Sequence, residues 1–206
     1  MISYLIFGIT YAFAAAVQPG PLQTYIISQT LKRGWRSTLP AAFAPVISDG
    51  PILLLVLFLL STVPDNFIFI LRIGGGLFLL YLGMNAYNSW KKYATDKIIS
   101  NGSSQQTLIK AVVVNLLNPA PYLGWSLILG PLFFEGWKIA PINGIALIFS
   151  FYMTMIITLA GIIILFAFAQ KLGPQVSKIL LGLSAIVLFS FGIYQLWVGI
   201  NYYVRV

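Results

Sequence analysis

Residues 17–21 read Val17-Gln18-Pro19-Gly20-Pro21 and interrupt an apolar stretch that begins at about Leu5. A proline in a helix interior removes a backbone donor and clashes with the preceding turn, so two prolines around a glycine open a helix rather than bend it. Inside a membrane every freed N–H and C=O must find a partner, and a broken helix persists only where protein or a wet cavity covers it. The break therefore predicts a site.

A second cluster of this kind, Asn118-Pro119-Ala120-Pro121, interrupts another apolar segment, and Pro119 lies 100 residues after Pro19. Tyr25 and Trp125 are separated by the same 100 residues. Paired interruptions at corresponding positions of two halves indicate the binding site of a transporter built from repeats. Two unrelated kinks are the alternative, because Pro-x-Pro is a short pattern.

The composition is that of an integral membrane protein. Of 206 residues, 59% are hydrophobic and only 8% are charged, whereas about a quarter of a soluble domain is charged. A helix needs roughly 20 apolar residues to cross the hydrocarbon core, and six such segments fit. They cover about residues 4–29, 38–62, 67–90, 108–133, 140–168 and 177–203. The first segment lacks the basic start and cleavage site of a signal peptide, so we expect it to be retained.

We therefore expect an all-α membrane protein of six transmembrane helices, arranged as a 3+3 inverted repeat with broken first and fourth helices. Residues 1–206 should form a single transmembrane domain. Its parts are a first three-helix repeat over 1–90, a cytoplasmic linker over 91–107 and a second three-helix repeat over 108–206. Three helices per half is an odd number, so the second half must be inverted.

Basic residues set the expected orientation. The net charge is +8, which in a membrane protein reflects Lys and Arg in cytoplasmic loops rather than binding to nucleic acid. Most of them are Lys32, Arg33, Arg36, Lys91, Lys92, Lys97, Lys110, Lys171 and Lys178, in or beside the first, third and fifth loops, whereas Arg72, Lys138 and Arg205 are on the opposite side. We expect these three loops in the cytoplasm and both termini outside.

The sequence contains no Cys and no His. This excludes disulfides, thiol redox chemistry and thiolate metal sites, and it removes the commonest transition-metal ligand and proton shuttle. We expect no cofactor and no metal site. An enzyme is not expected either, because Asp49, the one carboxylate expected deep in the membrane, provides neither a credible nucleophile nor an acid–base pair.

Asp49 is the acidic residue expected deepest in the membrane. It lies about eleven residues into the second segment, near the midplane, whereas Asp65 and Glu135 fall in predicted outer loops and Asp96 in a cytoplasmic one. An intramembrane carboxylate costs about 3 kcal/mol even on a lenient scale, so we predict that Asp49 carries the coupling proton or faces the substrate's amino group. Gly50 should allow close approach of a backbone or ligand. A structural Asp satisfied by the freed backbone of a broken helix is the alternative.

Amide and aromatic side chains complete the expected site. Asn115 and Asn118 are three residues apart, hence on one helical face, and Asn118 should also cap the second half-helix. The half-helix N-termini after Pro21 and Pro121 should direct partial positive charge at an anionic group. The expected substrate-binding residues are Gln18, Pro19, Gly20, Pro21, Gln23, Asp49, Asn115, Asn118, Pro119, Pro121, Tyr122 and Trp125, with Tyr25, Tyr122 and Trp125 as apolar walls and gates.

Several motifs follow one another in an order typical of one family. They are Gln18-Pro19-Gly20-Pro21, Lys32-Arg33-Gly34-Trp35-Arg36, Ser48-Asp49-Gly50, Leu71-Arg72-Ile73-Gly74-Gly75 with Tyr81-Leu82-Gly83, and Asn115-Leu116-Leu117-Asn118-Pro119. By these motifs, which cover about the first two thirds of the chain, the sequence resembles the LysE/RhtB-type amino-acid exporters. The resemblance implies a small exporter of amino acids or similar metabolites in the cytoplasmic (inner) membrane, driven by proton antiport.

Two departures indicate a divergent branch of that family. Ala120-Pro121-Tyr122-Leu123-Gly124-Trp125 replaces the usual continuation after Asn118-Pro119, and Pro45 and Pro51 surround Asp49 more densely than the family pattern. The substrate is therefore open. Two other functions are alternatives, namely a non-transporting membrane scaffold or accessory protein and a cation exporter of the same superfamily. The expected partners are a small-molecule substrate, protons and the lipid bilayer, with homo-oligomer formation left open and no nucleic acid.

Overall fold

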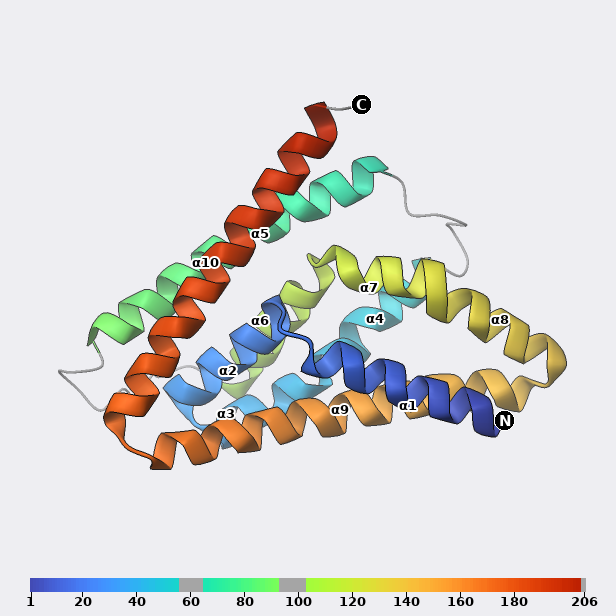
Figure 1. The fold of residues 1–206 in the computed structure, drawn as a ribbon, viewed down its shortest axis with the longest axis horizontal. Coiled ribbons are helices and arrows are strands. Elements are labelled where there is room, and N and C mark those ends of the chain that lie inside the picture. The colour runs from blue at the N-terminus through green and yellow to red at the C-terminus, as the bar shows by residue number, and fades with distance from the viewer. Residues whose placement is uncertain (56–64, 93–102, 205–206) are drawn as a thin grey trace.

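The computed structural model describes residues 1–55, 65–92 and 103–204, and the elements in these ranges are helical (Figure 1). They are α1 (Ile2–Val17), α2 (Pro21–Arg33), α3 (Trp35–Thr38), the 3₁₀-helix η1 (Leu39–Phe43), α4 (Ala44–Leu54), α5 (Asp65–Lys92), α6 (Ser104–Leu116), α7 (Pro119–Gly124), the π-helix η3 (Trp125–Leu129), α8 (Gly130–Ile139), α9 (Pro141–Lys171) and α10 (Pro174–Val204).

Four helical stretches are long and apolar enough to cross a membrane, and two bent helix pairs add two more if each pair is one span. The stretches are Trp35–Leu54, Phe69–Lys92, Pro141–Ala169 and Pro174–Asn201, and the pairs are Ile2–Val17 with Pro21–Arg33 and Ser104–Leu116 with Pro119–Ile139. The chain is therefore a multi-pass, all-helical membrane protein over the ranges described above. Each of the six predicted segments overlaps one of these stretches or pairs.

The first break lies between α1 and α2, which are bent by 61°. Pro21 begins α2, where its missing N–H would have had no helical partner. Two of the carbonyls freed at the end of α1 are bonded by one side chain, because Gln23 Nε2 donates to the oxygens of Ala15 and Ala16 at 3.1 Å each. These two groups thus find a partner within the chain, as a membrane requires.

The second break lies between α6 and α7, where the helices are bent by 55°. Asn118 caps α7, since its side-chain oxygen accepts from Ala120 N at 3.2 Å, which confirms the predicted capping role. Tyr122 Oη donates to the carbonyl of Leu116 at 2.9 Å. Two backbone groups of this break, the N–H of Ala120 and the carbonyl of Leu116, are therefore also bonded by local side chains.

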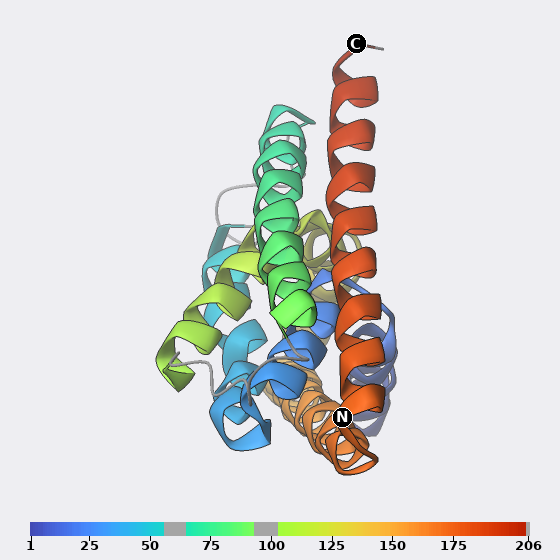
Figure 2. The same cartoon turned by 90° about the vertical axis from the view of Figure 1, so that its left-hand side faces the viewer.

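Helices from the two halves of the chain pack on one another. α1 lies along α9, α4 packs against α6, and α5 runs beside α10 (Figures 1 and 2). Small residues allow the last pair to approach closely: a Cβ added to Gly76 would lie 2.9 Å from the carbonyl oxygen of Gly192. The fully buried side chains include Trp125, Tyr25 and Leu147.

Some predicted boundaries are corrected. Glu135 lies on the exposed surface of α8 rather than in a loop, because the helix continues beyond the apolar segment to Ile139. Asp65 begins α5. Ser104–Leu116 is helical from its first residue, with Ser103 as N-cap, so the end of the predicted linker belongs to α6. The rest of that linker over 93–102, including Asp96 and Lys97, lies outside the described residues.

Candidate functional site

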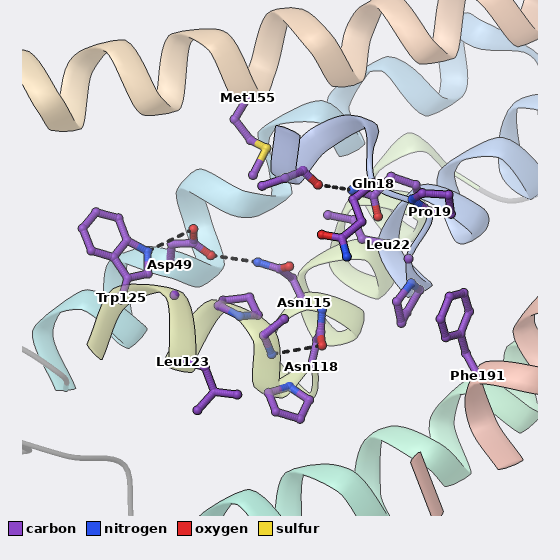
Figure 3. A pocket seen from close by; sticks show the side chains of 18 of the residues that line it. Gln18, Pro19, Leu22, Asp49, Asn115, Asn118, Leu123, Trp125, Met155 and Phe191 are labelled. Carbon is purple, nitrogen blue, oxygen red and sulfur yellow. Dashed lines mark hydrogen bonds between the residues drawn. The ribbon is translucent and has the colours of Figure 1, made fainter. Parts of the chain in front are cut away.

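A cavity of about 420 Å³ lies where the two breaks meet (Figure 3). Its lining includes both Pro-x-Pro clusters together with residues of α4, α5, α6, α9 and α10. Among the predicted site residues, the lining contains Gln18, Pro19, Gly20, Pro21, Gln23, Asp49, Asn115, Asn118, Pro119, Pro121 and Trp125. The structure therefore brings together nearly all of the predicted side chains, from both halves of the chain.

Asp49 lies at the wall of this cavity and is only 2% exposed. Its Oδ1 accepts a hydrogen bond from Asn115 Nδ2 at 2.8 Å and a longer one from Ser48 Oγ at 3.4 Å. Its Oδ2 accepts from the indole Nε1 of Trp125 at 3.4 Å. These donors are all neutral, so the carboxyl group is held by dipoles from α4, α6 and η3 rather than by a cation.

Asn115 and Ser48 form the short bonds of this cluster. Asn115 Nδ2 also donates to Ser48 Oγ at 2.7 Å, while Ser48 Oγ bonds back to the carbonyl of Ala44 at 2.8 Å. The backbone of α4 thus fixes Ser48, and Ser48 with Asp49 fixes the amide of Asn115. Asn118 lies beyond the end of α6, so the break, rather than one helical face, brings it to the same cavity.

Aromatic rings position Trp125 at the cavity. Its ring packs edge to face against the ring of Phe151, with 5.6 Å between the ring centroids, and stacks on the ring of Tyr152, with 6.2 Å between the centroids. Tyr11 extends this group toward α1 with its ring 6.3 Å from Phe151. Trp125 also begins the π-helix η3, an irregular helical turn of the kind often found at functional sites.

Two expectations about the site differ from the structure. Tyr122 and Tyr25 are not among the cavity-lining residues. Tyr122 bonds to Leu116 across the break, and Tyr25 is buried with its hydroxyl 3.4 Å from the carbonyl oxygen of Thr107. At Gly50 no described atom lies within 4 Å of an added Cβ, so no backbone approaches it closely and the predicted room for a ligand is open.

Other lining residues were not predicted. Arg72 was assigned to the outer side of the membrane by charge counting, but α5 begins at Asp65, and Arg72 lies two turns inside it at the cavity. Gln195 of α10 also lines the cavity. An amide within an apolar segment is the signal that pointed to Asn115, and it could have identified Gln195 as well.

Broken helices, a multi-pass architecture and a cavity between the breaks that presents carboxyl, amide and guanidinium groups are typical of a membrane transport protein. The family model described as LysE type translocator matches residues 13–198. The chain belongs to this family, as the sequence motifs indicated. Membership implies membrane export of amino acids or other small molecules, by transporters rather than enzymes. No curated protein and no solved structure matches the chain.

Proposed function

We propose that this protein is a secondary active exporter of amino acids or related small metabolites, coupled to the proton gradient through Asp49. The observation that supports this most strongly is the position of Asp49, a buried carboxyl group at the wall of a cavity between two broken helices. Its neutral donors leave it free to gain or lose a proton without breaking an ion pair.

Coupling follows from competition at this carboxyl group. A substrate amino group that approaches the charged form excludes the proton, and a bound proton releases the amino group. One site can therefore exchange substrate for protons. The guanidinium-bearing Arg72 lines the same cavity.

An inverted repeat of residues 1–90 and 108–206 would supply the movement, by rocking of one half against the other. Its support is the reciprocal packing: the broken first span contacts α9 of the second half, whereas the broken fourth span contacts α4 of the first half. α5 and α10, the third spans of the two halves, pack against each other. The cavity lies where these halves meet.

The direct test is transport by the purified protein in proteoliposomes, with a panel of amino acids supplied with and without a pH gradient. Uphill movement of at least one compound only when the gradient is present supports the proposal. A protein that is correctly inserted and moves none of them under either condition fits a scaffold or accessory protein instead. Metal cations are assayed in the same vesicles, and gradient-driven movement of these cations without movement of any amino acid fits the cation exporter.

A further inference from the structure

α5 and α10 add two further polar side chains to the cavity that Asp49 lines. Arg72 comes from α5 and Gln195 from α10. Phe191 lies one turn before Gln195 on the same face of α10, and Figure 3 shows it across the cavity from Asp49. The cavity therefore has an acidic group from α4 and a basic group from α5.

Both of these side chains carry a buried polar atom without a partner. Arg72 Nε and Gln195 Oε1 are two of the four buried side-chain atoms that make no hydrogen bond within the described ranges. Gln195 is only 5% exposed. Buried donors and acceptors are nearly always paired, so two unpaired atoms on one cavity call for an explanation. A ligand that offers an acceptor to Arg72 and a donor to Gln195 would provide one.

Close helix contact fixes the backbone positions that carry the two side chains. A Cβ added to Gly199 of α10 would lie 3.2 Å from the Cβ of Arg72, and one added to Gly192 would lie 3.0 Å from the carbonyl oxygen of Gly76. The two helices thus touch along the stretch that carries Arg72 and Gln195. Groups fixed in this way bind a ligand with little loss of conformational freedom.

We propose that Arg72 binds the carboxylate of the transported substrate, and that Gln195 Oε1 accepts a hydrogen bond from an N–H group of the same molecule, while the amino group is left to Asp49. The planar guanidinium matches a carboxylate with two parallel hydrogen bonds. The same positive charge repels cations that lack a carboxylate. This inference rests on the proposed export function and narrows its substrates to zwitterionic amino acids.

The test compares matched compounds on the purified full-length protein, by thermal unfolding in detergent. Common L-amino acids are titrated beside their carboxamides and their decarboxylated amines. We expect the acids to stabilise the protein at concentrations at least about tenfold lower than the matched amides and amines. Arg72→Gln should abolish this preference, and Arg72→Lys should keep part of it because a point charge still attracts a carboxylate. Lys138→Gln, which removes an exposed cation from α8, is the matched control and should behave like the unmodified chain.

Three results would overturn the carboxylate subsite: amides or amines that stabilise as well as the acids, Arg72→Gln protein with an unchanged preference, or no acid-specific stabilisation by any amino acid. If Arg72→Gln protein does not fold, the comparison of acids with their amides and amines on the unmodified chain still tests the carboxylate subsite. Gradient-driven transport of a decarboxylated amine would reject the subsite and keep the exporter. Acid-selective binding without gradient-driven transport would keep the subsite and contradict the proposed proton coupling.

Discussion

Asp49 links the two halves of the chain, because side chains of the second half donate hydrogen bonds to it. It belongs to α4, yet the hydrogen bonds that reach it from other elements come from Asn115 and Trp125, on either side of the second break. The sequence left open a structural role, in which the freed backbone of a broken helix would donate the hydrogen bonds to Asp49. In the described structure Gln23, Asn118 and Tyr122 bond four of the freed backbone groups, and the donors to Asp49 are side chains.

Asn115→Leu tests how far this cluster stabilises the fold. The substitution removes the short bonds to Ser48 and Asp49 and leaves buried acceptors unpaired, which should cost about 1–3 kcal/mol of unfolding free energy. Asn201→Leu is the control, because its amide is exposed and bonds only within α10; it should change stability by less than about 0.5 kcal/mol. Equal losses in the two variants, measured by unfolding in detergent, would contradict the structural role of Asn115.

At the scale of elements, α5 supports the second break. A Cβ added to Gly75 would lie 2.5 Å from the carbonyl oxygen of Leu117, the residue between α6 and the cap of α7. The helix can therefore lie directly against the break only because this position has no side chain.

Gly75→Ala should displace the backbone at the break, with a loss of about 1–3 kcal/mol of unfolding free energy and of transport. Gly161→Ala is the matched control in α9, where no described atom lies within 4 Å of the added Cβ. It should be neutral or stabilising by up to about 1 kcal/mol, because Ala favours a helix. A Gly75→Ala protein as stable and active as Gly161→Ala protein would show that the close contact is not required.

The sequence was sufficient to predict both breaks and most of the residues around them, because proline acts locally on the helix that contains it. It did not predict the cavity role of Arg72 and Gln195. α5 and α10 are apolar around much of their circumference, so periodicity does not show which face meets the cavity; their mutual packing decides this. Tyr25 and Tyr122 do not line the cavity for a different reason, because their hydroxyls bond to backbone carbonyls that only the folded chain brings near.

For the whole molecule, the distribution of Lys and Arg predicts the orientation in the membrane. The natural chain has no Cys, so single Cys substitutions can be labelled without background. Ser103→Cys and Gln175→Cys should react only from the cytoplasmic side, and Glu135→Cys only from outside; all three positions are exposed. Labelling of Glu135→Cys and Ser103→Cys from the same side would contradict the six-span topology, and a reversed pattern would contradict the orientation.

Proton coupling through Asp49 is tested most directly by substrate flux in proteoliposomes that contain a pH-sensitive dye and experience only a pH gradient. The unmodified chain should move substrate uphill while protons move in the opposite direction. Glu135→Gln, which removes an exposed carboxyl group from α8, should do the same. Asp49→Asn keeps the size of the side chain but cannot titrate, so protein that inserts normally should show no uphill flux. Uphill export by normally inserted Asp49→Asn protein would contradict the account and make Asp49 a structural residue.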